Sequence, residues 1–288
     1  MFKAIENEFL ISSNGNLAID SLSTGPDQVP DTKKAKKKLS KAVKKIDELQ
    51  RVLYAQDKFS LLLIFQAMDA AGKDSTIRAV TRGVNPAGFQ VSSFKQPSKL
   101  ELDHDFLWRS AIALPERGRI GIFNRSYYEE VLVVRVHPEY LGGQQLPVIS
   151  EDIWNERYQS INDHEKHLAL NGTVVLKFWL NVSRAEQKNR FISRIDDKTK
   201  NWKFSSGDVR ERSYWSDYMN AYQEMLKATS KPWAPWYAIP ADNKPFMRLQ
   251  VATIIKQTLS SLELRYPKLA ADEIAELETM RTQLEQDD

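Results

Sequence analysis

The sequence of 288 residues contains no cysteine, and this absence excludes several classes of protein. Without thiols the chain can form no disulfide scaffold, no thiolate metal site, no iron–sulfur cluster and no cysteine nucleophile. Only four histidines are present and no HExxH pattern accompanies them, which leaves little for a zinc site. The 42% hydrophobic and 27% charged residues are instead typical of a globular protein that folds around its own core.

Long apolar runs and a strong net charge are missing as well. The longest apolar stretch, residues 59–65, contains Ser60 and is far shorter than the roughly 20 residues of a membrane-spanning helix. The first residues lack the cationic start and apolar segment of a secretory leader, so we expect a cytoplasmic protein without membrane contact. The net charge of +3 is too small for nucleic-acid binding through bulk charge, so any anion site must be local.

The chain alternates short apolar runs with amphipathic helices, which favours one α/β domain. Residues 1–30, which contain glycines and prolines, predict an extended N-terminal arm. The alternation predicts a parallel sheet covered by helices on both faces. The expected strands are residues 59–66, 88–94, 118–124, 172–182 and 236–240.

Two charged segments flank this alternation. Residues 31–58 predict an amphipathic helix capped by Asp31, with ten basic and four acidic residues. Attraction of a polyanion and a solvated lysine face both stay open for it. Residues 267–288 are acidic and predict an exposed helix, packed by the apolar side chains Leu277, Met280 and Leu284.

The strongest chemical signal is AMDAAGKD, residues 67–74, which follows the first expected strand and precedes a helix. In a P-loop, backbone N–H groups and the helix N-terminus surround phosphate oxygens while a lysine neutralises them. Relative to the pattern GxxxxGK[ST], Ala67 replaces the first glycine and Asp74 replaces the hydroxyl residue. The strand–loop–helix setting still predicts a phosphate site. Its candidate residues are Ala70, Ala71, Gly72, Lys73, Asp74 and Ser75.

Two carboxylates, Asp69 and Asp74, lie within this loop, where phosphates would repel them unless they had a task. They are candidates to hold magnesium, or to orient or deprotonate an acceptor phosphate. For Asp74 a favourable interaction with the helix dipole, worth about 0.3–1 kcal/mol, is an equally good explanation.

A second polar cluster, NRSYYEE, follows the expected strand 118–124, at the end of the sheet where α/β proteins bind ligands. Asn124 stands where a Walker B element has aspartate, so a magnesium-facing carboxylate is expected at Glu129 or Glu130. Arg125 offers a planar fork of donors to a phosphate, and a surface salt bridge is its alternative. Arg135 lies in an apolar run and needs an anionic partner if it is buried.

Residues 190–212 are rich in arginine and lysine, are interrupted by Gly207 and are flanked by helices. A basic helical hairpin beside a phosphate loop is typical of a lid that closes over phosphates and excludes water. A solvated charged face is the alternative for this segment.

The blocks in this sequence closely resemble the polyphosphate kinase 2 family. They are QAMDAAGKD, GVNPAGFQV, DHDFLWR, IGIFNRSYYEEVLVVRVHPEYL, NWKFSSGDVRER and APWYAIPADNK, and the resemblance covers about residues 33–266. It implies a P-loop kinase domain over residues 31–266 with a helical lid at about 190–212. It also implies phosphoryl transfer between inorganic polyphosphate and nucleotides with Mg²⁺. The FNRS form resembles the subgroup that accepts both AMP and ADP, and GMP and GDP are further candidate acceptors.

The resemblance also implies roles for individual residues. Lys73 and Arg125 balance charge on the transferred phosphoryl group, Asp69 orients the acceptor, and Glu129 completes the catalytic set. The candidate metal ligands are Asp69, Asp74, Glu129 and Glu130. The candidate phosphate or polyphosphate contacts are Ala70, Ala71, Gly72, Asp74, Ser75, Asn124, Arg135, Arg190, Arg194, Lys203 and Arg212.

Two other functions remain open. An ATP-dependent nucleotide kinase would share the loop and the lid but would need ATP as donor. A non-catalytic polyphosphate- or nucleotide-binding module would have a decayed site, with Ala67, Asp74 and Asn124 as its marks. Similar proteins form homo-oligomers, so we expect a dimer or a tetramer.

Overall fold

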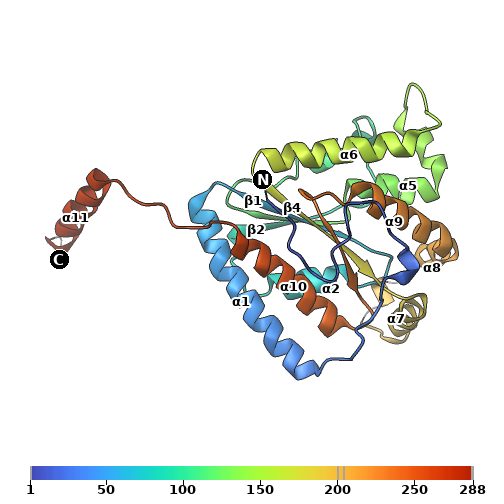
Figure 1. The fold of residues 1–288 in the computed structure, drawn as a ribbon, viewed down its shortest axis with the longest axis horizontal. Helices are drawn as coiled ribbons and strands as arrows, with labels where there is room; N and C mark the ends of the chain where they lie inside the picture. The colour runs from blue at the N-terminus through green and yellow to red at the C-terminus, as the bar shows by residue number, and fades with distance from the viewer. Residues whose placement is uncertain (1, 200, 204, 287–288) are drawn as a thin grey trace.

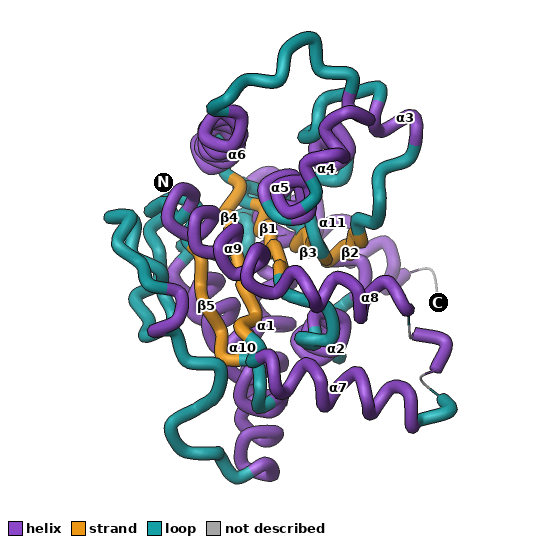
Figure 2. The backbone as a smooth tube through the Cα atoms, turned by 90° about the vertical axis from the view of Figure 1, so that its right-hand side faces the viewer, coloured by secondary structure: helices purple, strands orange, loops and turns teal. Residues whose placement is uncertain are grey.

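The expected strands form one parallel sheet in the order β2-β3-β1-β4-β5 (Figures 1 and 2). The structure is a computed structural model that describes residues 2–199, 201–203 and 205–286, with the backbone alone at Lys203. The strands are β1 (Ser60–Gln66), β2 (Phe89–Ser93), β3 (Ile120–Asn124), β4 (Thr173–Asn181) and β5 (Trp236–Pro240). The central strand β1 is buried along its whole length, as a parallel strand covered on both faces must be.

Helices cover both faces of the sheet (Figures 1 and 2). One face carries α1 (Thr32–Gln56), α2 (Lys73–Thr81) and α10 (Lys244–Ser261), which contact one another. The other face carries α5 (Val133–Val136), α6 (Ile153–Leu170) and α9 (Trp215–Thr229). This arrangement confirms the predicted α/β fold.

Shorter elements connect these layers. The remaining helices are α3 (Lys99–Leu102), α4 (Trp108–Ala111), α7 (Arg184–Asp196), α8 (Ser206–Glu211) and α11 (Ala271–Gln286). The 3₁₀ turns are η1 (Ile19–Ser21), η2 (Pro86–Gly88), η3 (Tyr127–Val131), η4 (Pro138–Gln144), η5 (Asn201–Lys203) and η6 (Arg212–Tyr214). None of the helices in these described ranges combines the length and apolar character needed to cross a bilayer.

The N-terminal arm covers the edge of the sheet at β5. Leu10 forms an antiparallel bridge with Tyr237, the Ile11 amide donates to the Trp236 carbonyl at 2.9 Å, and Ala238 donates to Phe9 at 2.8 Å. These bonds occupy backbone groups that an open sheet edge would leave unpaired.

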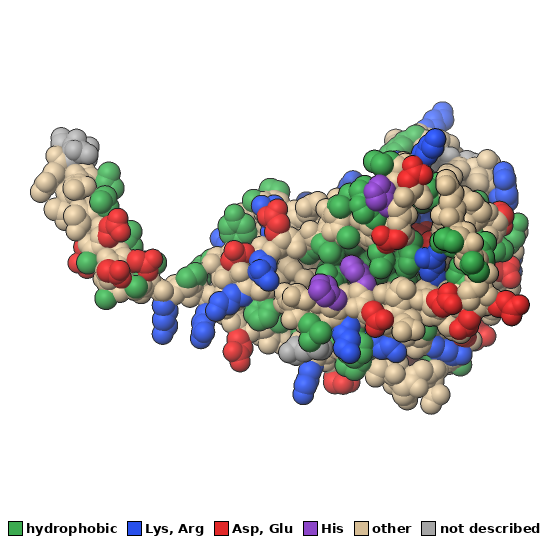
Figure 3. All heavy atoms as spheres, turned by 90° about the horizontal axis from the view of Figure 1, so that it is seen from above, with side chains coloured by type: hydrophobic (Ala, Val, Ile, Leu, Met, Phe, Trp, Pro, Cys, Tyr) green, Lys and Arg blue, Asp and Glu red, His purple; other side chains and the backbone are tan. Residues whose placement is uncertain are grey.

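The C-terminal helix α11 stands clear of the body at the end of residues 262–270 (Figures 1 and 3). The expected helix is present, but the prediction that its apolar side chains pack is wrong. Leu277, Met280 and Leu284 are 57%, 44% and 71% exposed, because the preceding segment holds α11 away from the domain.

Candidate functional site

The predicted phosphate loop connects the end of β1 to the first residue of α2. Gly72 has φ = 110°, a conformation that favours glycine, and an added Cβ would lie 3.3 Å from the Met247 methyl carbon. The hydroxyls of Ser75 and Thr76 each donate to the Gly72 carbonyl at 3.0 Å. The loop is therefore held in a defined curve at the N-terminus of α2, where backbone N–H groups can receive an anion.

Lys73 folds back across this loop. Its Nζ donates to the Ala67 carbonyl at 2.7 Å and its side chain is buried. Burial, and then the nearby charge of Arg125, lower the pKa of Lys73 to about 8. An arriving phosphate would add negative charge beside the buried ammonium and would favour its charged form.

Arg125 joins the ends of β1 and β3. Its backbone amide donates to the Phe65 carbonyl at 3.1 Å, and its φ is 64°. Its guanidinium binds Asp69 at 2.5 Å and Glu129 at 2.8 Å, and these carboxylates raise the pKa of Arg125 above its usual value. The charges of Asp69 and Glu129 also act to raise the pKa of Lys73, against the effect of burial. The four predicted catalytic residues, Asp69, Lys73, Arg125 and Glu129, therefore lie together.

Asn124 links β3 to the phosphate loop. Its amide donates to Asp74 Oδ1 at 2.9 Å, so two of the three positions that depart from the usual kinase patterns are direct partners. Asp74 therefore has a neighbour across the site in addition to the dipole of its own helix. No group of three His, Asp or Glu side chains suited to a metal occurs within the described residues.

Arg190, on α7, was a predicted polyphosphate contact, but each nitrogen of its guanidinium donates to oxygen atoms of the protein. The Nη1 atom binds the Ala70 and Ala71 carbonyls at 3.2 and 2.6 Å, and Nη2 binds those of Ala241 and Asp242 at 2.6 and 3.1 Å. The remaining donor, Nε, binds the Glu186 carboxylate at 2.7 Å. Since a guanidinium has five N–H groups, Arg190 positions the loop instead of holding a phosphate.

Gln187 connects the loop to the predicted lid, and no motif in the sequence indicated this role. Its Nε2 donates to the Asp69 carbonyl at 3.0 Å, and its Oε1 accepts from Arg212 at 2.7 Å. Arg194 pairs with Asp208 at 3.4 Å and thereby joins α7 to α8. Burial and the charge of Asp69 raise the pKa of Asp208, so α8 lies near the loop. The side chain of the predicted contact Lys203 lies outside the described part of the chain.

Arg135 and Glu130 have other partners than those predicted. Arg135 is half-buried and donates to the Tyr158 hydroxyl at 2.5 Å, so an aromatic residue stands where we expected an anion. Glu130 is buried, both its oxygens accept from Gln144 at 2.8 and 3.0 Å, and Arg157 lies 3.4 Å away. Glu130 therefore holds the η4 segment instead of facing a metal with Asp69.

A fully buried ionic network, missed at the sequence level, lies under η3, the turn that carries Glu129. The Lys177 ammonium donates to Glu165 at 2.6 Å, to the Tyr128 hydroxyl at 2.7 Å and to the Thr229 carbonyl at 2.8 Å. The hydroxyls of Tyr127 and Tyr128 both donate to Glu165, at 2.9 and 2.8 Å. One signal was available, since a lysine within the apolar strand VVLKFWL indicates a buried charge with a partner.

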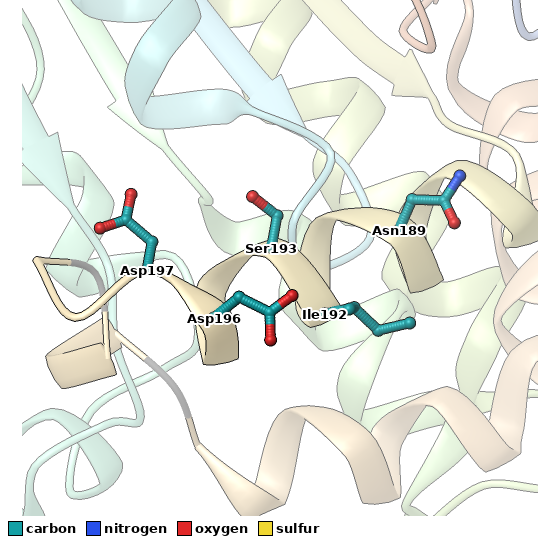
Figure 4. A pocket seen from close by; sticks show the side chains of 5 residues that line it. All are labelled: Asn189, Ile192, Ser193, Asp196 and Asp197. Carbon is teal, nitrogen blue, oxygen red and sulfur yellow. The ribbon is translucent and has the colours of Figure 1, made fainter.

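Hollows of different volume lie near these elements, and two of them are large. One is a cavity of about 880 Å³ bordered by Arg125 and Glu129, with Lys95, Arg109 and Phe106 on its walls. The other, of about 430 Å³, lies along α7 (Figure 4). Its lining side chains are Asn189, Ile192, Ser193, Asp196 and Asp197. Among the described residues, the second hollow is lined by acidic and no basic side chains and does not suit a phosphate, whereas the first has cations as well as carboxylates beside the predicted catalytic residues.

The profile of the family described as Polyphosphate kinase 2 (PPK2) matches residues 30–267. This chain belongs to the polyphosphate kinase 2 family. It is 53% identical over 245 residues to an "ADP-polyphosphate phosphotransferase" of Rhodopseudomonas palustris, covering 84% of this chain and 85% of the relative. It is 42% identical over 225 residues to an "AMP/ADP-polyphosphate phosphotransferase" of Meiothermus ruber, covering 78% and 81%.

A solved structure agrees with this family membership. The crystal structure of polyphosphate kinase 2 from Arthrobacter aurescens TC1 superimposes with a TM-score of 0.83 at 35% identity, covering 96% of this chain and 99% of that one. The likeness confirms the P-loop kinase fold and the family that the sequence motifs predicted.

Proposed function

We propose that this chain transfers the terminal phosphoryl group of inorganic polyphosphate to nucleoside mono- and diphosphates, converting AMP to ADP and ADP to ATP reversibly. The observation that carries the proposal is the meeting of Lys73, Arg125, Asp69 and Glu129 at a phosphate loop. Relatives named ADP-polyphosphate and AMP/ADP-polyphosphate phosphotransferases support the same donor and acceptors.

The reaction needs positioning and charge neutralisation more than a covalent nucleophile. The loop and Lys73 hold the end of the donor, and Arg125 faces the charge that develops on the transferred group. Asp69 orients the acceptor, whose phosphate oxygen attacks the terminal phosphorus while the bond to the bridging oxygen breaks. The polyphosphate leaves one phosphate shorter.

The residues at the loop fit a divalent cation, and we propose Mg²⁺. Among the described residues, Asp69, Asp74 and Glu129 each have one side-chain hydrogen-bonding or ion-pair partner, which leaves carboxylate oxygens for a hard cation. Proteins hold Mg²⁺ through one or two carboxylates together with substrate phosphates, so one or two of these three side chains suffice. When bound, the cation supplies charge neutralisation to the phosphates.

The cavity of about 880 Å³ is the proposed acceptor site. It opens beside Arg125 and Glu129, and its volume lies in the range of sites that bind small molecules. Its walls carry both signs of charge, and among them Lys95 and Arg109 are the cations that we assign to the acceptor's phosphates, while Phe106 offers an apolar surface to the nucleoside.

The segment 190–212 is the proposed lid of a kinase domain that spans residues 31–266. Gln187 and Arg194 tie it to the phosphate loop and to α8, so its movement would open or close the site against water.

We also propose that the chain forms a dimer or a tetramer, since α11 exposes apolar side chains beyond the domain. Light scattering measures the mass of the oligomer directly.

The function is tested by mixing the purified chain with polyphosphate, Mg²⁺ and AMP, ADP, GMP or GDP in turn, without ATP, and separating the nucleotides by chromatography. ATP from both AMP and ADP supports the proposal in full, and ATP from ADP alone restricts it to diphosphates. Turnover only with ATP as donor would instead indicate an ATP-dependent kinase. Binding without turnover would indicate a non-catalytic module.

A further inference from the structure

Helix α1 carries a row of lysines that the proposed reaction does not use. Because each residue turns a helix by about 100°, seven of its eight lysines fall within an arc of about 140° and extend over about 18 Å. They are Lys33, Lys34, Lys37, Lys38, Lys41, Lys44 and Lys45, which we call the lysine stripe. All seven are exposed, on the side of α1 opposite its buried residues.

Acidic side chains neutralise little of the positive charge of the lysine stripe. In the described part of the chain, Lys45 has an ion pair, with Glu48 at 3.0 Å, and the other six have none. Nine basic and two acidic residues give α1 a formal charge of +7. The whole chain has +3, so the residues outside α1 together have −4, and the excess positive charge of the protein resides on this helix.

A helix cap and a buried inner face hold the lysine stripe rigidly against the kinase domain. Asp31 caps α1 by accepting from the Lys34 amide at 2.7 Å, and its inner face, with Ala42, Val43 and Ile46, is buried. This face packs along α10 and touches α2 (Figure 1). The first turns of α2 and α10 meet at the phosphate loop, where the Thr76 hydroxyl contacts the Met247 sulfur at 3.8 Å. The lysines therefore form a fixed cationic track on the same helical layer as the loop.

We propose that the lysine stripe is a second binding surface for polyphosphate, which holds the body of a long chain while its end reacts at the phosphate loop. The inference rests on the proposed function, because polyphosphate is the linear polyanion that the reaction supplies. A long polyphosphate reaches both sites. Once its end is bound at the loop, its contact with the stripe is intramolecular, and this raises the overall affinity. A donor of three phosphates occupies the loop alone and gains nothing from the stripe.

The test compares two variants that remove equal charge. The stripe variant carries Lys34→Gln, Lys37→Gln and Lys41→Gln, and glutamine keeps the helix because its helix propensity is close to that of lysine. The control variant carries Lys3→Gln, Lys58→Gln and Lys268→Gln, at exposed positions outside α1. For both variants and the wild type, KM and kcat are measured with tripolyphosphate and with a long polyphosphate, across a series of salt concentrations.

The stripe variant should raise KM for long polyphosphate by about tenfold or more at low salt and flatten its salt dependence, because three phosphate contacts are lost. Its kcat and its KM for tripolyphosphate should stay as in the wild type, and the control variant should change neither. An equal rise in KM for both donors, or no rise beyond the control, overturns the proposal.

Direct binding separates this inference from the proposed function. Labelled long polyphosphate should bind the wild type more tightly than the stripe variant by anisotropy, whether or not nucleotide is converted. If the wild type converts no nucleotide, the proposed function is contradicted. The difference in polyphosphate binding between the wild type and the stripe variant can still be measured in that case. Equal binding of a DNA duplex of similar charge overturns a polyphosphate site. A change in sedimentation with unchanged polyphosphate binding overturns it in favour of a contact between subunits.

Discussion

Replacing Arg190 with glutamine should weaken both the fold and the reaction, because this side chain fastens the phosphate loop to the end of β5. Its shortest bonds to carbonyls, at 2.6 Å, go to the buried carbonyl groups of Ala71 and Ala241. A buried acceptor left without a partner costs about 1–3 kcal/mol, so losing two costs about 2–6 kcal/mol. At about 2–4 °C per kcal/mol for a chain of this size, Tm should fall by about 4 °C or more.

Scanning calorimetry on Arg190→Gln and Arg190→Lys, with Lys188→Gln as control, checks this expectation. Lys188 lies on the same helix and is exposed, so its loss should leave Tm within about 1 °C. Lysine keeps the charge at position 190 but has three donors instead of five, so Arg190→Lys should fall between glutamine and the wild type. If Arg190→Gln melts like the wild type, the carbonyl contacts do not fasten the loop.

Three further substitutions test other parts of the site. Lys177→Met should lower the free energy of unfolding by about 3–5 kcal/mol in urea, because Glu165 would keep a buried charge without its cation, and a smaller loss would contradict the network. Since the Lys73 pKa is lowered to about 8, its charge destabilises the substrate-free protein below that pH, and this penalty disappears as the pH rises toward 10.5. The Tm of Lys73→Met relative to the wild type should therefore be higher at pH 7 than at pH 10, and a difference independent of pH would refute the shift. Asp69→Asn should lower kcat by about 10²-fold or more and weaken the response to Mg²⁺ titration, whereas unchanged kinetics would remove Asp69 from the site.

The sheet and the closeness of the proposed catalytic residues could be predicted because both follow from local sequence patterns. The apolar run of β1 and the polar residues after β1 and β3 are visible in the sequence, and parallel strands end at one edge. Lys73 and Arg125 were therefore expected to approach each other, and the structure places them so. The family motifs added the phosphate donor, which composition alone does not indicate.

The residues that support the site could not be predicted, because their partners come from distant segments. The charge of Arg190 suggested a phosphate, but the backbone carbonyls it binds become neighbours only in the folded chain. Lys177 signalled a buried charge, yet nothing in α6 marked Glu165 as its partner. The arm at residues 2–30 pairs with β5 because β5 is an edge strand, which the order of the sheet decides.

The most direct measurement is ATP formation with polyphosphate as the sole donor, ADP as acceptor and Mg²⁺ present, in the wild type and in Lys73→Ala. We expect the wild type to form ATP, and Lys73→Ala to remain folded while its turnover falls by about 10²–10³-fold or more. Near wild-type turnover in Lys73→Ala, or a wild type that transfers only from ATP, would contradict polyphosphate-dependent transfer at this loop.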